Sequence, residues 1–300
     1  MIIIKIQGGL GNQMFEYALY EWLKHHGKDA KVDISQYGIA KKSGGADTVH
    51  NGYELEKLFS VSPVYATFGE ARWLGEVRTD ILYKVWKKYL KKSNKKTHLT
   101  RKHFGGNRWY IEEILNKDNI YLDGYWCTYK YADEIRDVIL EKFSFPEFAS
   151  DDVKNREAAK KMAETNSVSI HVRHGDYLKL QNVYCNLDKD YYNSAIEKIG
   201  ESVENPVFFC FSDDIEWCRE NIKAENIHFI DWNTGNDSYK DMQLMSLCKH
   251  NILANSTFSM WGAWLNKNPE KTVIRPERVF VNSSDEFSDF WPDEWIALKN

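Results

Sequence analysis

The segment Ser167–Tyr177, SVSIHVRHGDY, ends a predicted strand with an arginine. Side chains alternate along a strand, so its apolar residues share one face, and His171 and Arg173 share the other. Arg173 then stands at the carboxyl end, where open α/β sheets bind ligands, and a guanidinium binds two oxygens at once. These properties suit a diphosphate. The alternative is a structural salt bridge from Arg173 to Asp176 or elsewhere, and the spacing alone favours neither.

A second candidate phosphate site lies in LANSTFSMWGAWL, where a strand ending at Ala254 meets a helix that starts near Ser256 or Thr257. The unpaired N–H groups of a helix start, together with two hydroxyls, form an anion site that needs no basic side chain. Alternatively, Ser256 or Thr257 only caps the helix.

Acidic residues at two predicted helix starts have a local explanation. In FSDDIEWC, Asp213 and Asp214 follow a strand and a serine, and capping accounts for both carboxylates. Asp241 stands three residues after Ser238, which is close to a capping box with Asp in place of the usual Glu. In isolation, both features favour capping.

Two further motifs are weaker. The turn GGLGNQ, Gly8–Gln13, could cradle phosphate, but it lacks the GxGxxG spacing and no Walker lysine follows. The triplet Asp188, Lys189 and Asp190 has the DxD form with which metal-dependent sugar transferases hold a divalent ion. A match this short is also typical of an exposed loop or a helix start.

The elements around these residues alternate between strand and helix, which predicts two α/β domains that face each other. The best boundary is the stretch 144–152, giving domains 1–147 and 148–300. A helix begins near Asn12, and another is expected over 131–143. The predicted strands are separated by enough residues for a helix, as a parallel sheet requires. They cover residues 2–7, 30–34, 120–122, 168–172, 207–211, 227–230, 252–254 and 273–274.

Composition excludes several classes of protein. The 300 residues have a net charge of −4, which does not indicate nucleic-acid binding. No apolar run is long enough to span a bilayer and the amino terminus does not resemble a signal peptide, so we expect a cytoplasmic protein. The five cysteines include no CxxC pair, which predicts reduced core thiols and neither a disulfide framework nor a zinc site.

Charge is nevertheless unevenly distributed. Residues 81–111 contain ten Lys or Arg and no Asp or Glu, which leaves −14 on the other 269 residues. Apolar residues at helical spacing among these lysines predict a basic amphipathic helix. It is either a solvated face or a surface for peripheral membrane contact, which salt-sensitive binding to anionic liposomes would distinguish.

Together these motifs resemble glycosyltransferase family 11, the α-1,2-fucosyltransferases, and its bacterial branch in particular. The resemblance covers nearly the whole chain and is carried by IQGGLGNQMFEYA (6–18), DGYW (123–126), HVRHGDY (171–177), FSDDIEWC (211–218) and DMQLMSLCKHNILANSTFSMWGAWL (241–265). It implies a GT-B fold of two Rossmann-like domains, the first on the acceptor side and the second binding GDP-fucose.

The resemblance also implies roles for individual residues. Arg173 matches the arginine that holds the β-phosphate, and His171 matches the histidine beside the nucleoside. Asp241 resembles an aspartate that accepts from N1 and N2 of guanine. Further donor contacts are implied for Gly11 and Asn12 of the amino-terminal turn, and for Ser256, Thr257 and Phe258 at the diphosphate.

Other roles are less defined. Asp213 and Asp176 are members of the family motifs, and Asp176 is expected to act with Arg173 in catalysis by orienting it. Tyr125 and Trp126 are expected to stack on acceptor sugar. Two departures from the family pattern are His174, where Arg is common, and Met260, where Trp is common. His174 removes a positive charge near the phosphates at neutral pH.

The implied reaction is the inverting transfer of L-fucose from GDP-β-L-fucose to the 2-hydroxyl of a galactoside, within an oligosaccharide or a lipid-linked glycan of the bacterial surface. Fixed positive potential at the leaving phosphate makes a metal cofactor unnecessary. The general base is unassigned, with Asp33, His50 and Glu54 as candidates. Alternatives are a GDP-sugar transferase of other linkage or sugar, a non-catalytic carbohydrate-binding protein, and a phosphate-loop nucleotidase, which the missing lysine motif disfavours.

Overall fold

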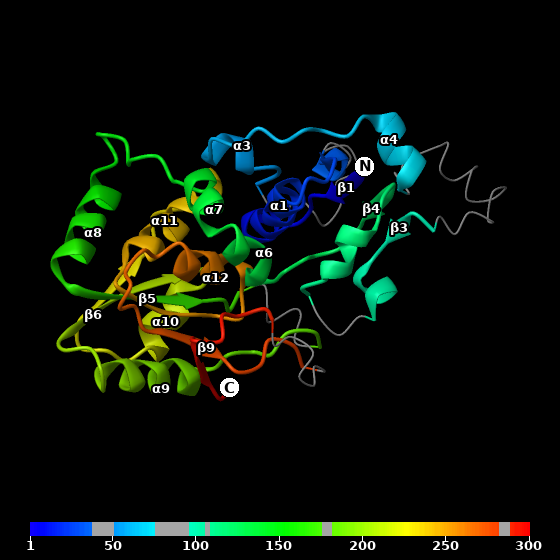
Figure 1. Ribbon diagram of the computed structural model, residues 1–300. Coiled ribbons are helices and arrows are strands. Elements are labelled where there is room, and N and C mark those ends of the chain that lie inside the picture. Colours follow the sequence, from blue (N-terminus) through cyan, green and yellow to red (C-terminus); the bar gives the residue numbers. More distant parts are fainter. Residues whose placement is uncertain (38–50, 76–95, 106–108, 176–181, 282–288) are drawn as a thin grey trace. The chain divides into compact units, whose positions relative to one another are not determined.

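The computed structural model describes residues 1–37, 51–75, 96–105, 109–175, 182–281 and 289–300 (Figure 1). The chain divides into two compact units. One comprises Met1–Ser144 and Glu286–Phe290, and the other comprises Phe145–Asp285 and Trp291–Asn300. The division after Ser144 falls three residues before the predicted one. The return of 286–290 to the first unit has no signal in the sequence.

The first unit contains a parallel sheet of four short strands in the order β2-β1-β4-β3. β1 is so apolar that Ile2, Ile3 and Ile4 are all buried, as expected of a strand that is covered on both faces. The strands are β1 (Ile2–Lys5), β2 (Ala30–Asp33), β3 (His98–Leu99) and β4 (Ile120–Leu122). The helices are α1 (Leu10–His25), α3 (Leu55–Leu58), α4 (Phe68–Leu74), α6 (Tyr129–Glu134) and α7 (Arg136–Lys142), with 3-10 turns η2 (Arg101–Phe104) and η3 (Glu112–Asn116).

The single helix expected over 131–143 is wrong, because α6 and α7 are separate. Ile135 separates them with ψ 41°, outside the helical region, while its side chain is buried. A β-branched residue has reduced helix propensity, so the cost of leaving the helix at this position is small.

The second unit contains a parallel sheet in the order β10-β9-β8-β5-β6-β7. The strands are β5 (Asn166–Val172), β6 (Pro206–Ser212), β7 (Ile227–Ile230), β8 (His250–Ile252), β9 (Val273–Pro276) and β10 (Ile296–Leu298). The helices are α8 (Val153–Glu164), α9 (Lys189–Gly200), α10 (Ile215–Asn221), α11 (Tyr239–Leu247) and α12 (Thr257–Trp264), with the 3-10 turn η5 (Gly235–Asp237). This is the strand order of a doubly wound, nucleotide-binding sheet. Four of the five strands predicted here are confirmed, the fifth is found two residues earlier than predicted, at 250–252 and not at 252–254, and β10 was not predicted.

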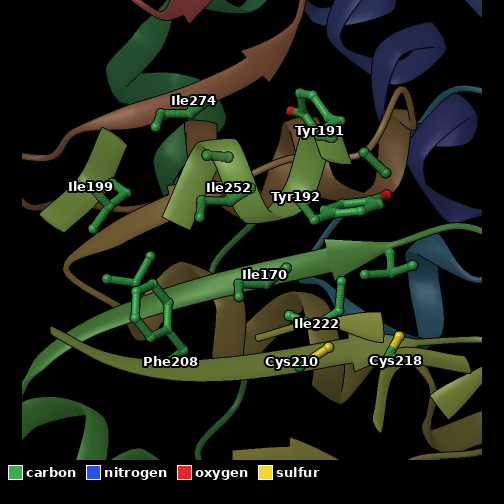
Figure 2. Packing of buried hydrophobic residues seen from close by; sticks show 14 of the residues in the cluster. Ile170, Tyr191, Tyr192, Ile199, Phe208, Cys210, Cys218, Ile222, Ile252 and Ile274 are labelled. Carbon is green, nitrogen blue, oxygen red and sulfur yellow. The ribbon is translucent and has the colours of Figure 1, made fainter. Parts of the chain in front are cut away.

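The core of the second unit lies between its sheet and the helices α9 and α10 (Figure 2). Tyr191, Tyr192 and Ile199 of α9 face Ile170 of β5 and Ile252 of β8, and all five side chains are buried. Four of the five cysteines are also buried and all five are free thiols, as the sequence predicts. The opposite face, which bears Ser169 and His171, is covered from the α11 side, where Asn251 bonds to Ser169 Oγ and to Met245 O.

Replacing Ile170 with alanine should lower the free energy of unfolding by about 2–5 kcal/mol, because the side chain is 0% exposed at the centre of this core. Urea unfolding of both proteins measures the difference. A loss below ~1 kcal/mol would show that the site collapses around the cavity or is less well packed than described. Lys160→Ala, on the exposed face of α8, is the control and should change little.

Candidate functional site

The site is built at the carboxyl edge of the second sheet. From β5 the chain moves outward through β6 and β7, then returns to β8 on the other side of β5 and continues through β9 and β10. The switch point of the topology therefore lies between β5 and β8, where open α/β sheets bind their ligands. His171 lies in β5 next to its last residue and Arg173 directly follows the strand, while Ser256–Phe258 follow β8, so both predicted phosphate segments flank this point.

His171 is a neutral imidazole in this site. Burial, followed by the nearby charge of Arg173, lowers its pKa to about 3. The ring is 5% exposed and its centroid lies 5.6 Å from that of Phe258, so two predicted donor residues are in contact range. Its Nδ1 is buried and has no hydrogen-bond partner among the described residues. An orphaned polar atom costs ~1–3 kcal/mol, which a ligand that bonds to it would recover.

Arg173 is held beside Asp213, which follows the neighbouring strand. Its Nε lies 3.5 Å from Asp213 Oδ2, and its side chain is 29% exposed. Asp213 Oδ1 accepts from the backbone N–H groups of His174 and Gly175 at 3.0 and 3.3 Å. Burial alone would raise the pKa of Asp213, but the charge of Arg173 and these two N–H groups outweigh it and lower the pKa. Asp213 therefore remains an anion that can orient the guanidinium.

Asp176, which was predicted to orient Arg173, lies outside the described ranges. The carboxylate that lies beside Arg173 in the structure is that of Asp213. The register explains this placement, because Val172 is opposite Ser212 and the two residues that follow are therefore neighbours. A salt bridge and a phosphate site are compatible here, since a guanidinium has five N–H donors.

His174 packs against α10. Its Nδ1 lies 2.8 Å from Asp214 Oδ2, and its ring stacks on Trp217 with centroids 4.4 Å apart. Asp214 is also the N-cap of α10 and accepts from Trp217 N. The capping role predicted for this carboxylate is thus confirmed.

The start of α12 follows β8 directly. Ser256 is its N-cap, 7% exposed, and its Oγ accepts from Phe258 N at 3.2 Å. The capping interpretation of Ser256 is confirmed, whereas phosphate binding by the amide groups of Thr257 and its neighbours stays a prediction. A cap and an anion site can coexist, because a helix start has four N–H groups without intrahelical partners.

Asp241 lies in the first turn of α11 and does not form the predicted capping box. The N-cap residue Ser238 makes no side-chain capping bond in the described structure. Instead, Asp241 Oδ1 accepts from Asn233 Nδ2 at 2.8 Å, and Asn233 is bonded in turn to Asn155. Burial raises the pKa of Asp241 to about 7 although the bond from Asn233 lowers it. The Asp241 carboxyl thus lies at the carboxyl edge of the second sheet, at the start of α11. As a partly ionised hydrogen-bond acceptor, it suits a ligand that carries hydrogen-bond donors.

In the first unit, Asn12 lies over the glycine turn that precedes α1. Gly8 has φ 76°, and a Cβ added there would lie 2.7 Å from Asn12 Nδ2, so glycine is required both by conformation and by this close approach. Gln13 Nε2 and Tyr37 OH both donate to Gly8 O. The turn is therefore rigid, and the donor contacts expected of Gly11 and Asn12 stay predictions.

Of the two aromatic residues predicted to stack on acceptor sugar, only Tyr125 is accessible, at 43% exposure. Trp126 is 0% exposed. Its ring is part of the core, so stacking by Trp126 is corrected to a packing role. Among the candidate bases, Asp33 and Glu54 are buried and His50 lies outside the described residues. Residues 81–111 also lie outside, apart from 96–105 and 109–111.

A polar cluster formed by residues of β1 and β3 and by the residue after β4 was not predicted from the sequence. Asp123 Oδ1 lies 2.9 Å from Lys5 Nζ, and Asp123 Oδ2 lies 3.1 Å from His98 Nε2. The three residues come from distant segments, and only Asp123 belongs to a motif, DGYW. Strand pairing brings them together, so nothing local in the sequence could identify the cluster.

The DxD triplet has a structural role. Asp188 is the N-cap of α9, and its Oδ1 accepts from Asp190 N and Tyr191 N. Within the described ranges, no group of three or more His, Cys, Asp and Glu side chains is arranged to hold a metal ion. In the same ranges, no helix has the length and apolar character to cross a membrane.

Two α/β units with parallel sheets, one of them doubly wound, are the architecture of the GT-B fold, which is a fold of glycosyltransferases. A solved structure, the NodZ α-1,6-fucosyltransferase soaked with GDP-fucose, shares this fold with a TM-score of 0.50 and 13% identity, over 88% of this chain and 92% of that chain. The fold predicted from the sequence is confirmed.

The chain belongs to glycosyl transferase family 11, whose sequence pattern matches residues 1–299. It is 30% identical to an α-1,2-colitosyltransferase of Escherichia coli, over 100% of this chain and 99% of the relative. It is also 24% identical to the galactoside 2-α-L-fucosyltransferase Sec1 of Mus musculus, over 99% of this chain and 74% of that protein. The predicted family and enzyme class are therefore confirmed.

Proposed function

We propose that this glycosyltransferase moves L-fucose from GDP-β-L-fucose to the 2-hydroxyl of a galactoside, with inversion and without a metal ion. The observation that carries the proposal is the placement of Arg173 and the start of α12 on the two sides of the switch point between β5 and β8. These groups supply two sources of positive potential for a diphosphate. The membership of family 11 supports the sugar and the linkage.

In this proposal the second unit stabilises the leaving group. As the bond from fucose to GDP breaks, negative charge grows on the β-phosphate, and Arg173, fixed by Asp213, faces that charge. Preorganised charge of this kind needs no reorganisation during the reaction and replaces a divalent ion. The amide groups at the start of α12 add to the same potential.

The same unit would recognise the nucleoside. Guanine presents N1–H and N2–H₂ side by side, a donor pair that adenine lacks, and an ionised Asp241 accepts both. The pKa of about 7 in the free protein would fall when guanine binds, because hydrogen bonds to a carboxylate favour its charged form. Nδ1 of His171 is available to a further donor of the ligand if it is the unprotonated nitrogen, or to an acceptor if it is protonated.

A second candidate donor is GDP-colitose. The E. coli relative that is 30% identical over the whole chain transfers colitose in an α-1,2 linkage. Colitose is fucose without the 3-hydroxyl. The two reactions therefore share the leaving group GDP, with its guanine, and the linkage that is formed. A group that bonds to the 3-hydroxyl would be left unpaired by colitose, and a site of this type discriminates strongly between the two.

The test combines the protein with GDP-fucose and lactose in EDTA, then follows GDP release and assigns the product linkage by NMR. We expect an α-1,2-fucosylated product at the rate seen without chelator. GDP release that requires an added divalent ion would overturn the metal independence. Absence of transfer from GDP-fucose, with transfer from GDP-colitose under the same conditions, would assign the second donor instead.

A further inference from the structure

A pocket of about 380 Å³ opens in the first unit at the carboxyl end of β2. This volume is within the ~300–1,000 Å³ typical of small-molecule sites. Residues that line it include Asp33, Ser35, Glu56, Tyr65, Phe68 and Ala71. None of them belongs to the motifs that identified the family, and Asp33 alone has a role considered above, as a candidate general base.

The aromatic wall of the pocket is fixed by the backbone. Val32 N donates to Val64 O and Ala66 N donates to Val32 O, both at 2.9 Å, so the segment around Tyr65 extends the sheet beside β2. Thr67 and Glu70 then form a capping box that starts α4. Phe68 is thus the first residue of a defined helix, although its side chain is 52% exposed. Together with Tyr65, which is 36% exposed, Phe68 presents aromatic surface along the pocket.

Carboxylates supply the polar side of the pocket. Asp33 is 6% exposed, and its two oxygens accept from Ser35 N at 2.8 Å and from Tyr121 OH at 2.7 Å. Each carboxylate oxygen has a second lone pair, so Asp33 can accept further bonds without moving. Glu56 is exposed and is hydrogen-bonded to the hydroxyl of Tyr65.

This lining discriminates between classes of ligand. None of the described residues that line the pocket is basic, and Lys31, which is close by on β2, is paired with Glu70 at 2.5 Å. Two carboxylates without a cation repel a phosphate or a nucleotide, so the sugar-nucleotide donor is excluded as the ligand of this pocket. A neutral pyranose fits, because its C–H face packs on aromatic rings while its hydroxyls donate to carboxylates.

We propose that this pocket binds a neutral pyranose of the acceptor glycan. Phe68 and Tyr65 pack on the sugar ring, and Asp33 and Glu56 accept from its hydroxyls. The inference rests on the proposed function, because it names the site at which the acceptor of that reaction is held. Besides Tyr125, four further residues would then contact the acceptor glycan, and none of these four belongs to the family motifs.

The test compares Phe68→Ala and Glu56→Ala with the control Trp73→Ala. Trp73 is on the same helix and is 78% exposed, but it does not line the pocket. With lactose as acceptor, each pocket variant should raise the acceptor KM by roughly 3- to 10-fold or more. GDP affinity, measured by calorimetry, should not change. The control should keep both constants.

A direct measurement uses lactose alone, by saturation-transfer NMR without donor. Signals expected for the wild type and Trp73→Ala should be lost in Phe68→Ala. If an active enzyme keeps its acceptor KM and its lactose signal in both pocket variants, the pocket assignment is wrong and the proposed function stands. If the wild type transfers no sugar but its lactose signal depends on Phe68, the proposed function fails and the pocket assignment stands.

Discussion

Replacing Arg173 with alanine should abolish sugar transfer while the protein stays folded. The guanidinium lies at the switch point beside Asp213 from the adjacent strand. In the proposed reaction it opposes the negative charge that develops on the leaving diphosphate. Removing one preorganised group of this kind costs about 10²- to 10³-fold in kcat. The protein should stay folded, because Asp213 keeps the hydrogen bonds from the N–H groups of His174 and Gly175 when the guanidinium is removed.

The measurement is GDP release at saturating donor and acceptor, with circular dichroism to confirm the fold. Arg173→Lys should recover only part of the activity, because an ammonium cannot bind two phosphate oxygens in the planar geometry of a guanidinium. Arg219→Ala is the matched control, since Arg219 of α10 forms an exposed pair with Asp231, which follows β7, and should be dispensable. Retention of more than about a tenth of wild-type turnover in Arg173→Ala would contradict the assigned role.

Replacing Asp241 with asparagine should weaken GDP binding and remove part of its pH dependence. In the free protein burial raises the pKa of Asp241 to about 7, and only the ionised form can accept from both guanine donors. As the pH falls from 8 to 6 the carboxyl takes up a proton, so wild-type affinity should decrease roughly 10-fold over this interval. Above pH 8 the group is ionised and the affinity should level off.

Calorimetric titration with GDP at several pH values tests this, with wild type and variant compared at each. The phosphate of GDP titrates in the same range, but it does so for both proteins, so the difference between the two profiles belongs to Asp241. Asp237→Asn is the control, because Asp237 is an exposed neighbour that pairs with Lys240. Parallel profiles for wild type and Asp241→Asn would return Asp241 to a structural role in the Asn233 network.

The second sheet was predictable because buried parallel strands appear as short apolar runs with a helix between them. Strands β3 and β10 were not predicted because they lack this pattern. β3 has two residues, and β10 is an edge strand in which Ile296 is 39% exposed, so neither is a buried apolar run. The break at Ile135 is a single-residue event that periodicity cannot register.

The placement of the candidate residues was predictable where they belong to one contiguous segment, as with His171 and Arg173 and with Ser256–Phe258. It was not predictable where contacts depend on strand register or on burial. The pairing of Arg173 with Asp213 follows from the alignment of β5 with β6, and the burial of the Trp126 ring follows from the fold of the first unit. The pocket beside Asp33 also joins segments that share no local pattern, since Tyr65 and Phe68 are reached only through the bridge to Val32.

In the proposed reaction, Arg173 and the beginning of α12 hold a diphosphate together at the switch point. A crystal structure of the protein with bound GDP tests it most directly. We expect the β-phosphate to contact the guanidinium of Arg173 and backbone N–H groups of residues 257 and 258, with guanine on Asp241. A β-phosphate bound away from both Arg173 and α12 would contradict the account.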